Sequence, residues 1–395
     1  MASIKSGRIG RKGILFLLTM SLGYAVYAAD RTVLQSVITA VKPDLGLTDV
    51  QRGLLLSAQY IGVLAVVLGA GHLSDRYGKW EMILIGVVTF SAFTWLIAFA
   101  TDFYQAFTFR LLSGIGEGIF WPVAMSAVAN YFREDRGLAL GAFYVGFDAG
   151  GAGGSAIGGL SLSLTSGWRS AFLVAPLLGI AVVAGLFVAR SSFAETDAEK
   201  GAVSLGRDAV RLLENKRILV IMLFAFLATY SVAVWQNYLT TYWNSVRGVD
   251  KAVAAYGYAA VLVSGGFGKL ILGRLSDRRP RSKVILVIVS ASLALFALFF
   301  LSGNVYSGFI LALGAGFASS AMFPVMQALA SDSSNGKTGT ALGLTTTFQS
   351  VATVLSPTLT SYFMPQGVGM AIALNVTIPM LAVVLVAIFL SDPRT

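Results

Sequence analysis

Five ionisable residues stand inside long apolar stretches of the sequence, where a charge is expensive. Asp30 and Arg31 lie in the first stretch, Arg110 and Glu117 in the fourth, and Asp148 in the fifth. At the centre of a bilayer a charged side chain costs about 3 kcal/mol even on insertion scales, so such residues are candidates for function. The first four comprise two acids and two bases and can neutralise one another. We expect them to carry charge chemistry rather than to form a purely structural salt-bridge cluster.

The spacing of Arg110 and Glu117 puts them on one helix face. Seven residues are two helical turns less about 20°, so the side chains lie about 10 Å apart along the helix. A guanidinium stays charged at any relevant pH and can hold a carboxylate through two parallel hydrogen bonds. We therefore predict that Arg31 or Arg110 binds a carboxylate of the ligand. Glu117, with Asp30, is predicted to carry a proton, because protonating one carboxylate frees an arginine for an added anion.

The composition identifies the elements that must position these charges. The chain has 395 residues, of which 56% are apolar and only 12% are charged, and its mean hydropathy is +0.76. Soluble proteins carry about 25% charged residues, so this is an integral membrane protein. With no cysteine and a single histidine, His72, a disulfide framework, a thiolate or multi-histidine metal site and a cysteine nucleophile are excluded. No serine can be paired with His72, and we expect neither an enzyme nor a cofactor.

A membrane-spanning helix needs about 20 mostly apolar residues, and the sequence offers twelve such stretches. We predict an all-α membrane protein with spans near 13–41, 52–72, 81–100, 104–130, 138–165, 169–189, 217–243, 253–275, 283–302, 305–330, 339–363 and 367–391. The connections are short except for the charge-rich segment 190–216. This segment predicts a cytoplasmic linker between an N-terminal six-helix bundle (1–189) and a C-terminal one (217–395).

The distribution of basic residues predicts the orientation. With a cytoplasmic N-terminus, most of the 29 Lys and Arg residues fall in cytoplasmic loops or tails. Apart from the two arginines within spans, the exceptions are Lys42, Arg52, Arg169, Arg247 and Lys251. Basic residues collect on the cytoplasmic side, so both termini are predicted there, in the cell (inner) membrane. The same rule accounts for the net charge of +10 without a nucleic-acid partner.

The two halves of the sequence repeat at a constant offset of 202 residues. Three pairs of segments match: GHLSDRYGKW (71–80) with GRLSDRRPRS (273–282), FWPVAMSAVA (120–129) with MFPVMQALAS (322–331), and GLALG (137–141) with GTALG (339–343). Parallel repeats of this kind form two bundles related by an axis along the membrane normal, with the binding site between them.

GHLSDRYGK between spans 2 and 3 resembles the G-x-x-x-D-R-x-G-R/K loop of the major facilitator superfamily, and GRLSDRRPR is its second copy. Lys79 stands where arginine is usual, and Pro280 replaces the second glycine. The resemblance implies two six-helix bundles that rock against each other. We expect its charged residues to gate this motion, because the aspartates can accept hydrogen bonds from helix N-termini across the interface. They are Asp75, Arg76, Asp277 and Arg278.

YAADRT in span 1 and RLLSGIGEG in span 4 resemble the anion:cation symporter family. NYFREDRGLALG also fits that family's W-x-P-x-x-x-R-G-x-A-x-G stretch, with Arg133 in place of its proline. In proton-coupled members, the counterparts of Asp30 and Glu117 are implicated in proton coupling, while those of Arg31 and Arg110 attract the anion. Span 7 lacks the further arginine of vesicular members, which disfavours a dicarboxylate.

Neutral polar residues are expected to complete the site. At the 202-residue offset, Arg110, Glu117 and Asp148 meet uncharged residues, so charge handling is assigned to the first half and hydroxyl recognition to the second. The remaining predicted substrate contacts are Tyr27, Tyr60, Asp148, Gln236, Asn237, Tyr238, Gln349 and Asn375.

These observations predict a monomeric transporter that imports a small organic anion with protons by alternating access. The anion is expected to be a hydroxylated monocarboxylate such as a sugar acid, and sodium stays open as the coupling ion. The alternative is a proton-driven exporter of drugs or organic cations on the same fold. GGAGGSAIGG (150–159) nearly matches an antiporter signature, with Ser155 for its proline, but glycines also let helices pack closely, which we favour.

Overall fold

The computed structural model describes residues 11–132, 136–165, 167–193, 215–333 and 338–389, and every regular element in these ranges is a helix. The helices are α1 (Arg11–Asp44), α2 (Asp49–Tyr77), α3 (Lys79–Ile97), α4 (Phe103–Tyr131), α5 (Arg136–Leu164), α6 (Arg169–Val174), α7 (Leu177–Val188), α8 (Arg190–Phe193), α10 (Lys216–Arg247), α11 (Lys251–Arg278), α12 (Arg281–Leu301), α13 (Val305–Ser320), α14 (Met322–Asp332), α15 (Thr338–Phe363), a 3₁₀ turn η1 (Met364–Gln366) and α16 (Val368–Ile388).

Two of the predicted spans consist of two consecutive helices. The sixth is formed by α6 and α7, which are interrupted at Pro176, and the tenth by α13 and α14, which are interrupted at Ala321, three residues before Pro324. Proline lacks a backbone N–H and clashes with the preceding turn, so it favours such breaks. Each predicted span thus corresponds to one helix or one broken helix.

Ten of the described spans are long and apolar enough to cross a membrane. The other two, α5 and α15, are rich in Gly, Ser and Thr, and contain 29 and 26 residues. At 1.5 Å per residue both still exceed the hydrocarbon thickness of about 30 Å. An all-helical membrane protein was therefore predicted correctly from the sequence.

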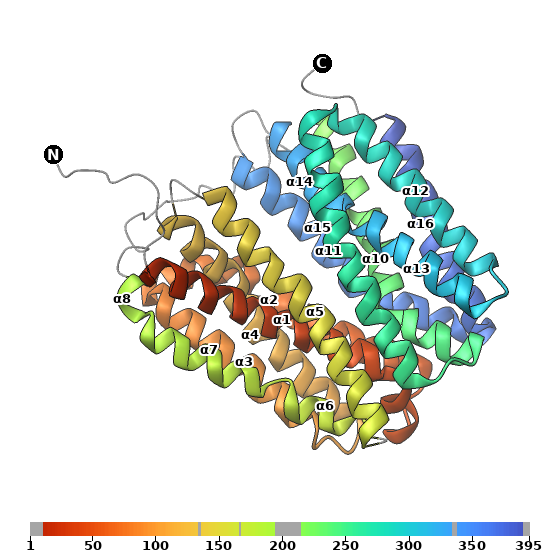
Figure 1. Ribbon diagram of the computed structural model, residues 1–395, viewed down its shortest axis with the longest axis horizontal. Coiled ribbons are helices and arrows are strands. Elements are labelled where there is room, and N and C mark those ends of the chain that lie inside the picture. The colour runs from red at the N-terminus through yellow and green to blue at the C-terminus, as the bar shows by residue number, and fades with distance from the viewer. Residues whose placement is uncertain (1–10, 133–135, 166, 194–214, 334–337, 390–395) are drawn as a thin grey trace.

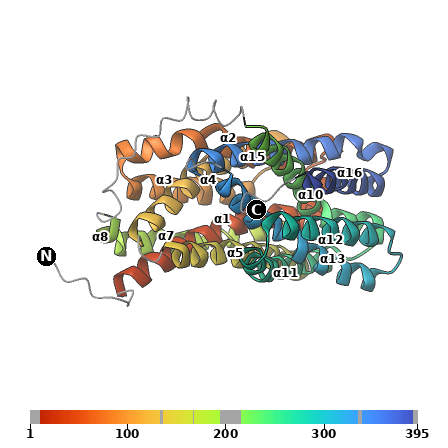
Figure 2. The ribbon, with the colours of Figure 1, turned by 90° about the horizontal axis from the view of Figure 1, so that it is seen from above.

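The helices form two groups, with α1–α8 on one side and α10–α16 on the other (Figure 2). Between the groups, α2 packs against α15 along one edge and α5 against α11 along the other, and α1 contacts α10 near the centre. Because residues 194–214 lie outside the described part, the linker at 190–216 and the division of the chain there stay predictions.

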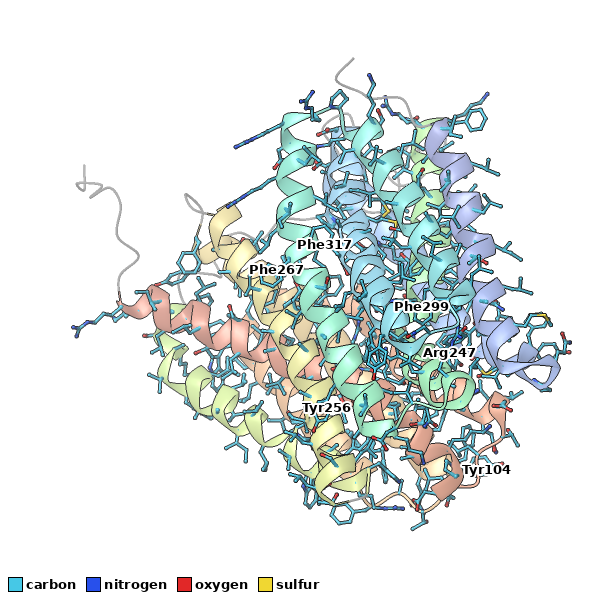
Figure 3. All side chains as sticks on the ribbon, turned by 45° about the vertical axis from the view of Figure 1, so that its right-hand side comes forward. Tyr104, Arg247, Tyr256, Phe267, Phe299 and Phe317 are labelled. Atoms are coloured by element: carbon cyan, nitrogen blue, oxygen red, sulfur yellow. The ribbon has the colours of Figure 1, made fainter. Side chains whose placement is uncertain are left out.

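Small residues allow α5 to approach its neighbours closely. A Cβ added at Gly150 would lie 2.0 Å from the carbonyl oxygen of Ala25 in α1. On the other side of α5, Ser155 Oγ donates to the carbonyl of Ala255 in α11 at 2.8 Å. Tyr256 of α11 also lies beside α5 (Figure 3), where an added Cβ at Gly159 would meet its ring at 2.8 Å. The glycine-rich stretch of α5 is therefore a packing surface between the two groups.

The two groups meet toward the C-terminal ends of α1 and α10. They diverge toward the side on which both chain termini lie (Figure 1). On the side away from the termini, Arg52 of α2 contacts Met364 of η1 in the other group. Ser57, five residues further along α2, donates to the carbonyl of Val354 at 2.7 Å. The structure is thus closed on the side away from the termini.

Cysteine labelling tests the predicted orientation. Ser191 and Ser245 are exposed at opposite ends of the helices, and the chain contains no cysteine of its own. We expect an impermeant thiol reagent applied outside intact cells to label Ser245→Cys but not Ser191→Cys. The reverse pattern, or outside labelling of both, would contradict cytoplasmic termini.

Candidate functional site

A cavity of about 170 Å³ lies between the two groups of helices, near the middle of their length. Pockets for drug-sized ligands measure about 300–1,000 Å³, so this one suits a smaller molecule. Its walls come from α1, α2, α4 and α5 on one side and from α15 on the other. The lining residues are Tyr24, Tyr27, Arg31, Tyr60, Val63, Trp121, Phe147, Thr346, Gln349, Ser350 and Thr353.

Arg31 and Glu117 form an ion pair at the wall of this cavity. Arg31 Nε donates to Glu117 Oε2 at 3.2 Å, and the Arg31 side chain is 19% exposed while that of Glu117 is fully buried. Gln59 donates to the other Glu117 oxygen. The Arg31 guanidinium carbon lies 4.5 Å from the ring centre of Tyr27 and 5.0 Å from that of Tyr60. Both rings therefore contact the guanidinium at the cavity surface.

Asp30 and Arg110 form a second pair that is sealed from the cavity. Arg110 Nη1 lies 2.8 Å from Asp30 Oδ1, and the side chains are 2% and 3% exposed. Thr94 and Ser113 each donate to the Asp30 carboxylate at 2.6 Å. Arg110 also donates to the backbone carbonyls of Asp30 and Arg31. An arginine with this many partners locks α1 onto α4.

The structure thus brings the four predicted charges together but divides them by exposure. Arg31 alone among them lines the cavity, and Glu117 lies directly behind it. Sequence spacing placed Arg110 and Glu117 on one face of α4, which is the face toward α1. It carried no information on which of the two arginines reaches the cavity.

Asp148 pairs with Lys269 of α11, which the sequence analysis did not identify as a site residue. The pair joins the two groups of helices and is partly exposed, at 24% and 29% of the two side chains. The Lys269 ammonium also lies 5.5 Å from the ring of Phe147, which lines the cavity. A lone lysine inside the apolar span 253–275 was the available signal for this partner.

Of the other predicted contacts, Tyr27, Tyr60 and Gln349 line the cavity. Asn237 is buried and accepts a hydrogen bond from Gln35 at 3.0 Å. Gln236 is half-buried and is not part of the cavity lining.

Two predicted contacts lie elsewhere. Tyr238 donates to the carbonyl of Pro357 at 2.6 Å and packs under Arg52, so it belongs to the closed side of the interface. Asn375 accepts from Tyr230 at 2.7 Å and lines a separate groove with exposed apolar residues such as Met370.

Gln35 was not predicted as a functional residue. It forms contacts between the two groups of helices on the closed side of the cavity, away from the termini, and we call these contacts the barrier. Its amide nitrogen donates to Tyr60 at 3.2 Å and to Asn237 at 3.0 Å, and its amide oxygen accepts from Tyr258 at 2.6 Å. Thr240 donates to its backbone carbonyl at 2.7 Å. Gln35 and Asn237 correspond at the 202-residue offset, so the repeat itself was the signal that pointed to this contact.

Replacing Gln35 by methionine should loosen this barrier, because the amide ties α1 to α10 and α11 and its loss leaves buried polar partners unsatisfied. We expect a cysteine at the cavity residue Thr353 to react severalfold faster with an impermeant reagent from outside when Gln35→Met is present. The exposed Gln105→Met serves as control. Unchanged reactivity would show that Gln35 does not hold the barrier.

The predicted gating residues are only partly described. The Asp75 side chain lies outside the described part of the structure. Arg76 and Arg278 are exposed, and Asp277 accepts from Arg281 of its own helix group at 3.4 Å. Arg281 in turn pairs with Asp332 at 2.6 Å. Gating by these residues stays a prediction.

Within the described residues, no group of three or more His, Asp or Glu side chains could hold a metal ion. The chemistry available at the cavity is therefore that of one accessible guanidinium, one buried carboxylate, aromatic rings and neutral hydroxyl and amide groups.

A family model described as Major Facilitator Superfamily matches residues 20–357, with a second match over 264–395. A crystal structure of a bacterial homologue of the human lysosomal transporter Spinster, in an inward-facing and unoccupied conformation, superposes with a TM-score of 0.77. It covers 97% of this chain and 96% of the other at 20% identity. This likeness concerns the fold.

Curated relatives include transporters of several kinds. The "Probable sulfoacetate transporter" of Cupriavidus necator is 25% identical over 88% of this chain and 86% of its own length. A gallate transporter of Pseudomonas putida is 28% identical over 69% of this chain and 67% of its own. An agnestins efflux protein of Paecilomyces divaricatus is 28% identical over 72% of this chain, which spans 64% of that relative.

Proposed function

Because the chain belongs to the major facilitator superfamily, we propose that it carries a small organic anion together with protons by alternating access. Transport rather than catalysis is the function of this family, and the chain is a multi-pass membrane protein. The finer assignment to anion:cation symporters and to a hydroxylated monocarboxylate belongs to this proposal. The relatives named for sulfoacetate and gallate support an anion.

One observation carries the proposal: an accessible arginine is backed by a fully buried carboxylate. Arg31 lies at the cavity surface with Glu117 behind it, 3.2 Å from Arg31 Nε. Among the described residues, no hydrogen bond is made by either terminal nitrogen of Arg31. These two nitrogens are the pair that a guanidinium uses to hold a carboxylate in parallel.

Charge balance couples the proton to the anion. With both carboxylates ionised, the cluster of Asp30, Arg31, Arg110 and Glu117 has no net charge, so an added anion would be left unbalanced. Protonating Glu117 removes the charge that opposes Arg31 and leaves the cluster at +1. The anion then binds and restores neutrality. Proton and anion reinforce each other's binding, by about 1–3 kcal/mol if the coupling is typical.

The contacts that close one side of the cavity support alternating access. The contacts of Gln35, Ser57 and Arg52 close the side away from the termini, which the predicted orientation makes the outer side. Separating the two helix groups there, and closing them at the opposite side, would expose the same cavity to the outside.

The second candidate is a proton-driven exporter of organic cations. Aromatic rings around the cavity would suit a lipophilic cation, and one relative is named as an efflux protein. Arg31 opposes this assignment, because its charge would face the bound cation. Asp148, a partly exposed acid next to the cavity residue Phe147, is already paired with Lys269.

Reconstituted vesicles distinguish the two candidates. We expect a pH gradient that is acidic outside the vesicles and neutral inside to drive accumulation of a radiolabelled organic acid. When the acid is the only solute added, its entry should dissipate this gradient. A panel of organic acids first screened by thermal shift supplies the labelled compound. Efflux of an organic cation against an opposite proton flow, without movement of any acid, would overturn the proposal in favour of the exporter.

A further inference from the structure

The cavity wall on the Arg31 side is built almost entirely of aromatic rings. Five of its residues are aromatic, and Val63 is apolar. The rings support one another: Tyr24 stacks on Phe143 with centroids 4.4 Å apart and planes at 7°, and it lies 5.0 Å from Phe147. Such mutual contacts fix the rings in place and present flat apolar faces to the ligand. The five are Tyr24, Tyr27, Tyr60, Trp121 and Phe147.

The opposite wall, on α15, offers hydrogen-bond acceptors. Thr346, Ser350 and Thr353 each donate their hydroxyl proton to the carbonyl four residues earlier, at 2.8, 2.9 and 2.8 Å. A hydroxyl has one donor and two acceptor lone pairs, so these groups retain acceptor capacity toward the cavity. A ligand hydroxyl that points at α15 can therefore donate to them.

From these two walls we propose that the transported anion is a hydroxylated aromatic monocarboxylate. Its carboxylate binds the terminal nitrogens of Arg31, its ring lies among Tyr24, Tyr27 and Phe147, and its ring hydroxyl donates to the hydroxyl oxygens on α15. This inference rests on the proposed function, since it assigns the anion that the same cavity carries.

A sugar acid, which the sequence alone suggested, fits these walls less well. It has a hydroxyl on almost every carbon, and those turned toward Phe147 and Val63, whose side chains have no polar atom, would lose water without gaining a partner. Each buried hydroxyl left unpaired costs about 1–3 kcal/mol. A flat ring with one polar edge avoids this penalty. With one cation exposed at the cavity, a single carboxylate suffices to balance the charge.

A matched ligand panel on the purified, full-length protein tests the inference directly. The panel contains 4-hydroxybenzoate, benzoate, 4-hydroxycyclohexanecarboxylate, gluconate and sulfoacetate, with binding measured by thermal shift and tryptophan fluorescence, and transport by counterflow in vesicles. We expect 4-hydroxybenzoate to bind at least about tenfold more tightly than gluconate or the cyclohexane analogue, and benzoate to bind with intermediate affinity.

Two variants test whether the aromatic wall and the α15 wall of the cavity determine these ligand preferences. Phe147→Leu keeps an apolar side chain but removes the ring, and should weaken binding of 4-hydroxybenzoate about three- to tenfold. Phe99→Leu, in the turn after α3 where the wild-type side chain is 53% exposed, should have no effect. Thr353→Val should weaken 4-hydroxybenzoate but not benzoate. Thr347→Val, at a half-buried neighbour that makes the same bond to its own helix and does not line the cavity, is its control.

The outcomes distinguish a failure of the aromatic substrate class from a failure of the proposed anion transport. If gluconate or sulfoacetate binds as tightly as 4-hydroxybenzoate and is transported, the aromatic class is wrong while anion transport stands. If no organic acid binds or moves, the proposed function itself fails. Should Phe147→Leu not fold, the panel on the wild-type protein still decides.

Discussion

The Glu117→Gln variant should lose pH-driven accumulation of the substrate while it still exchanges substrate across the membrane. A gradient of about one pH unit can support about tenfold accumulation for each coupled proton. In the variant we expect the internal and external concentrations to become equal. Counterflow between labelled and unlabelled substrate should continue at a rate comparable to that of the wild type.

The reason lies in the contacts of Glu117. Its carboxylate accepts from Arg31 at 3.2 Å and from Gln59 on its other oxygen, in a fully buried position. Glutamine has the same shape and keeps an acceptor oxygen, so the local packing survives. It is always neutral, so it mimics the protonated carboxyl group and leaves Arg31 permanently available. The anion should bind with little dependence on pH, and no proton would be released with it.

The exposed Glu81→Gln of α3 provides the matched control, since Glu81 lies in the first turn of α3 and does not line the cavity. It should accumulate substrate as the wild type does. Uphill accumulation that persists in Glu117→Gln at an unchanged proton-to-substrate ratio would show that the coupled proton is carried elsewhere.

The charged cluster illustrates what the sequence could and could not predict. Charges are rare in apolar stretches, so Asp30, Arg31, Arg110 and Glu117 stood out by type alone, and the helical period put the last two on one face. Which arginine reaches the cavity depends on how α1 is rotated and how α4 packs against it. Those angles come from contacts between distant segments and leave no local pattern in the sequence.

Neutral polar residues were harder to assign for the same reason. Gln35 and Tyr238 are unremarkable in an apolar stretch, yet one ties α1 to α10 and α11 and the other packs under Arg52 at the closed interface. The spans were predictable because hydropathy acts locally. The aromatic walls of the cavity required the packing of four helices, and aromatic residues are common in any membrane core.

Lysine substitutions at Arg31 and Arg110 should affect different quantities, the affinity for the substrate in the first case and the melting temperature in the second. Arg31→Lys should weaken substrate binding about tenfold or more and change the melting temperature little. The charge near Glu117 is kept, but lysine lacks the planar fork that holds a carboxylate in two places. It also loses the contacts of the guanidinium with Tyr27 and Tyr60, whose ring centres lie 4.5 and 5.0 Å from the guanidinium carbon.

Arg110→Lys should instead lower the melting temperature and leave the affinity of the folded protein nearly unchanged. A single ammonium cannot replace bonds to Asp30 Oδ1 and to the carbonyls of Asp30 and Arg31 at once. The neutral Arg110→Met goes further, because it leaves Asp30 charged and unpaired at 3% exposure. Removing one partner of a buried pair costs about 3–5 kcal/mol.

Arg169→Lys is the control for both, since Arg169 pairs with Asp44 where both side chains are more than 40% exposed. Exposed pairs contribute about 0–1 kcal/mol, so this variant should resemble the wild type in melting temperature and in affinity. Measuring both quantities on all four variants separates binding from folding. If Arg110→Lys lost binding at an unchanged melting temperature while Arg31→Lys bound normally, the roles of the two arginines would be the reverse of those inferred from their exposure.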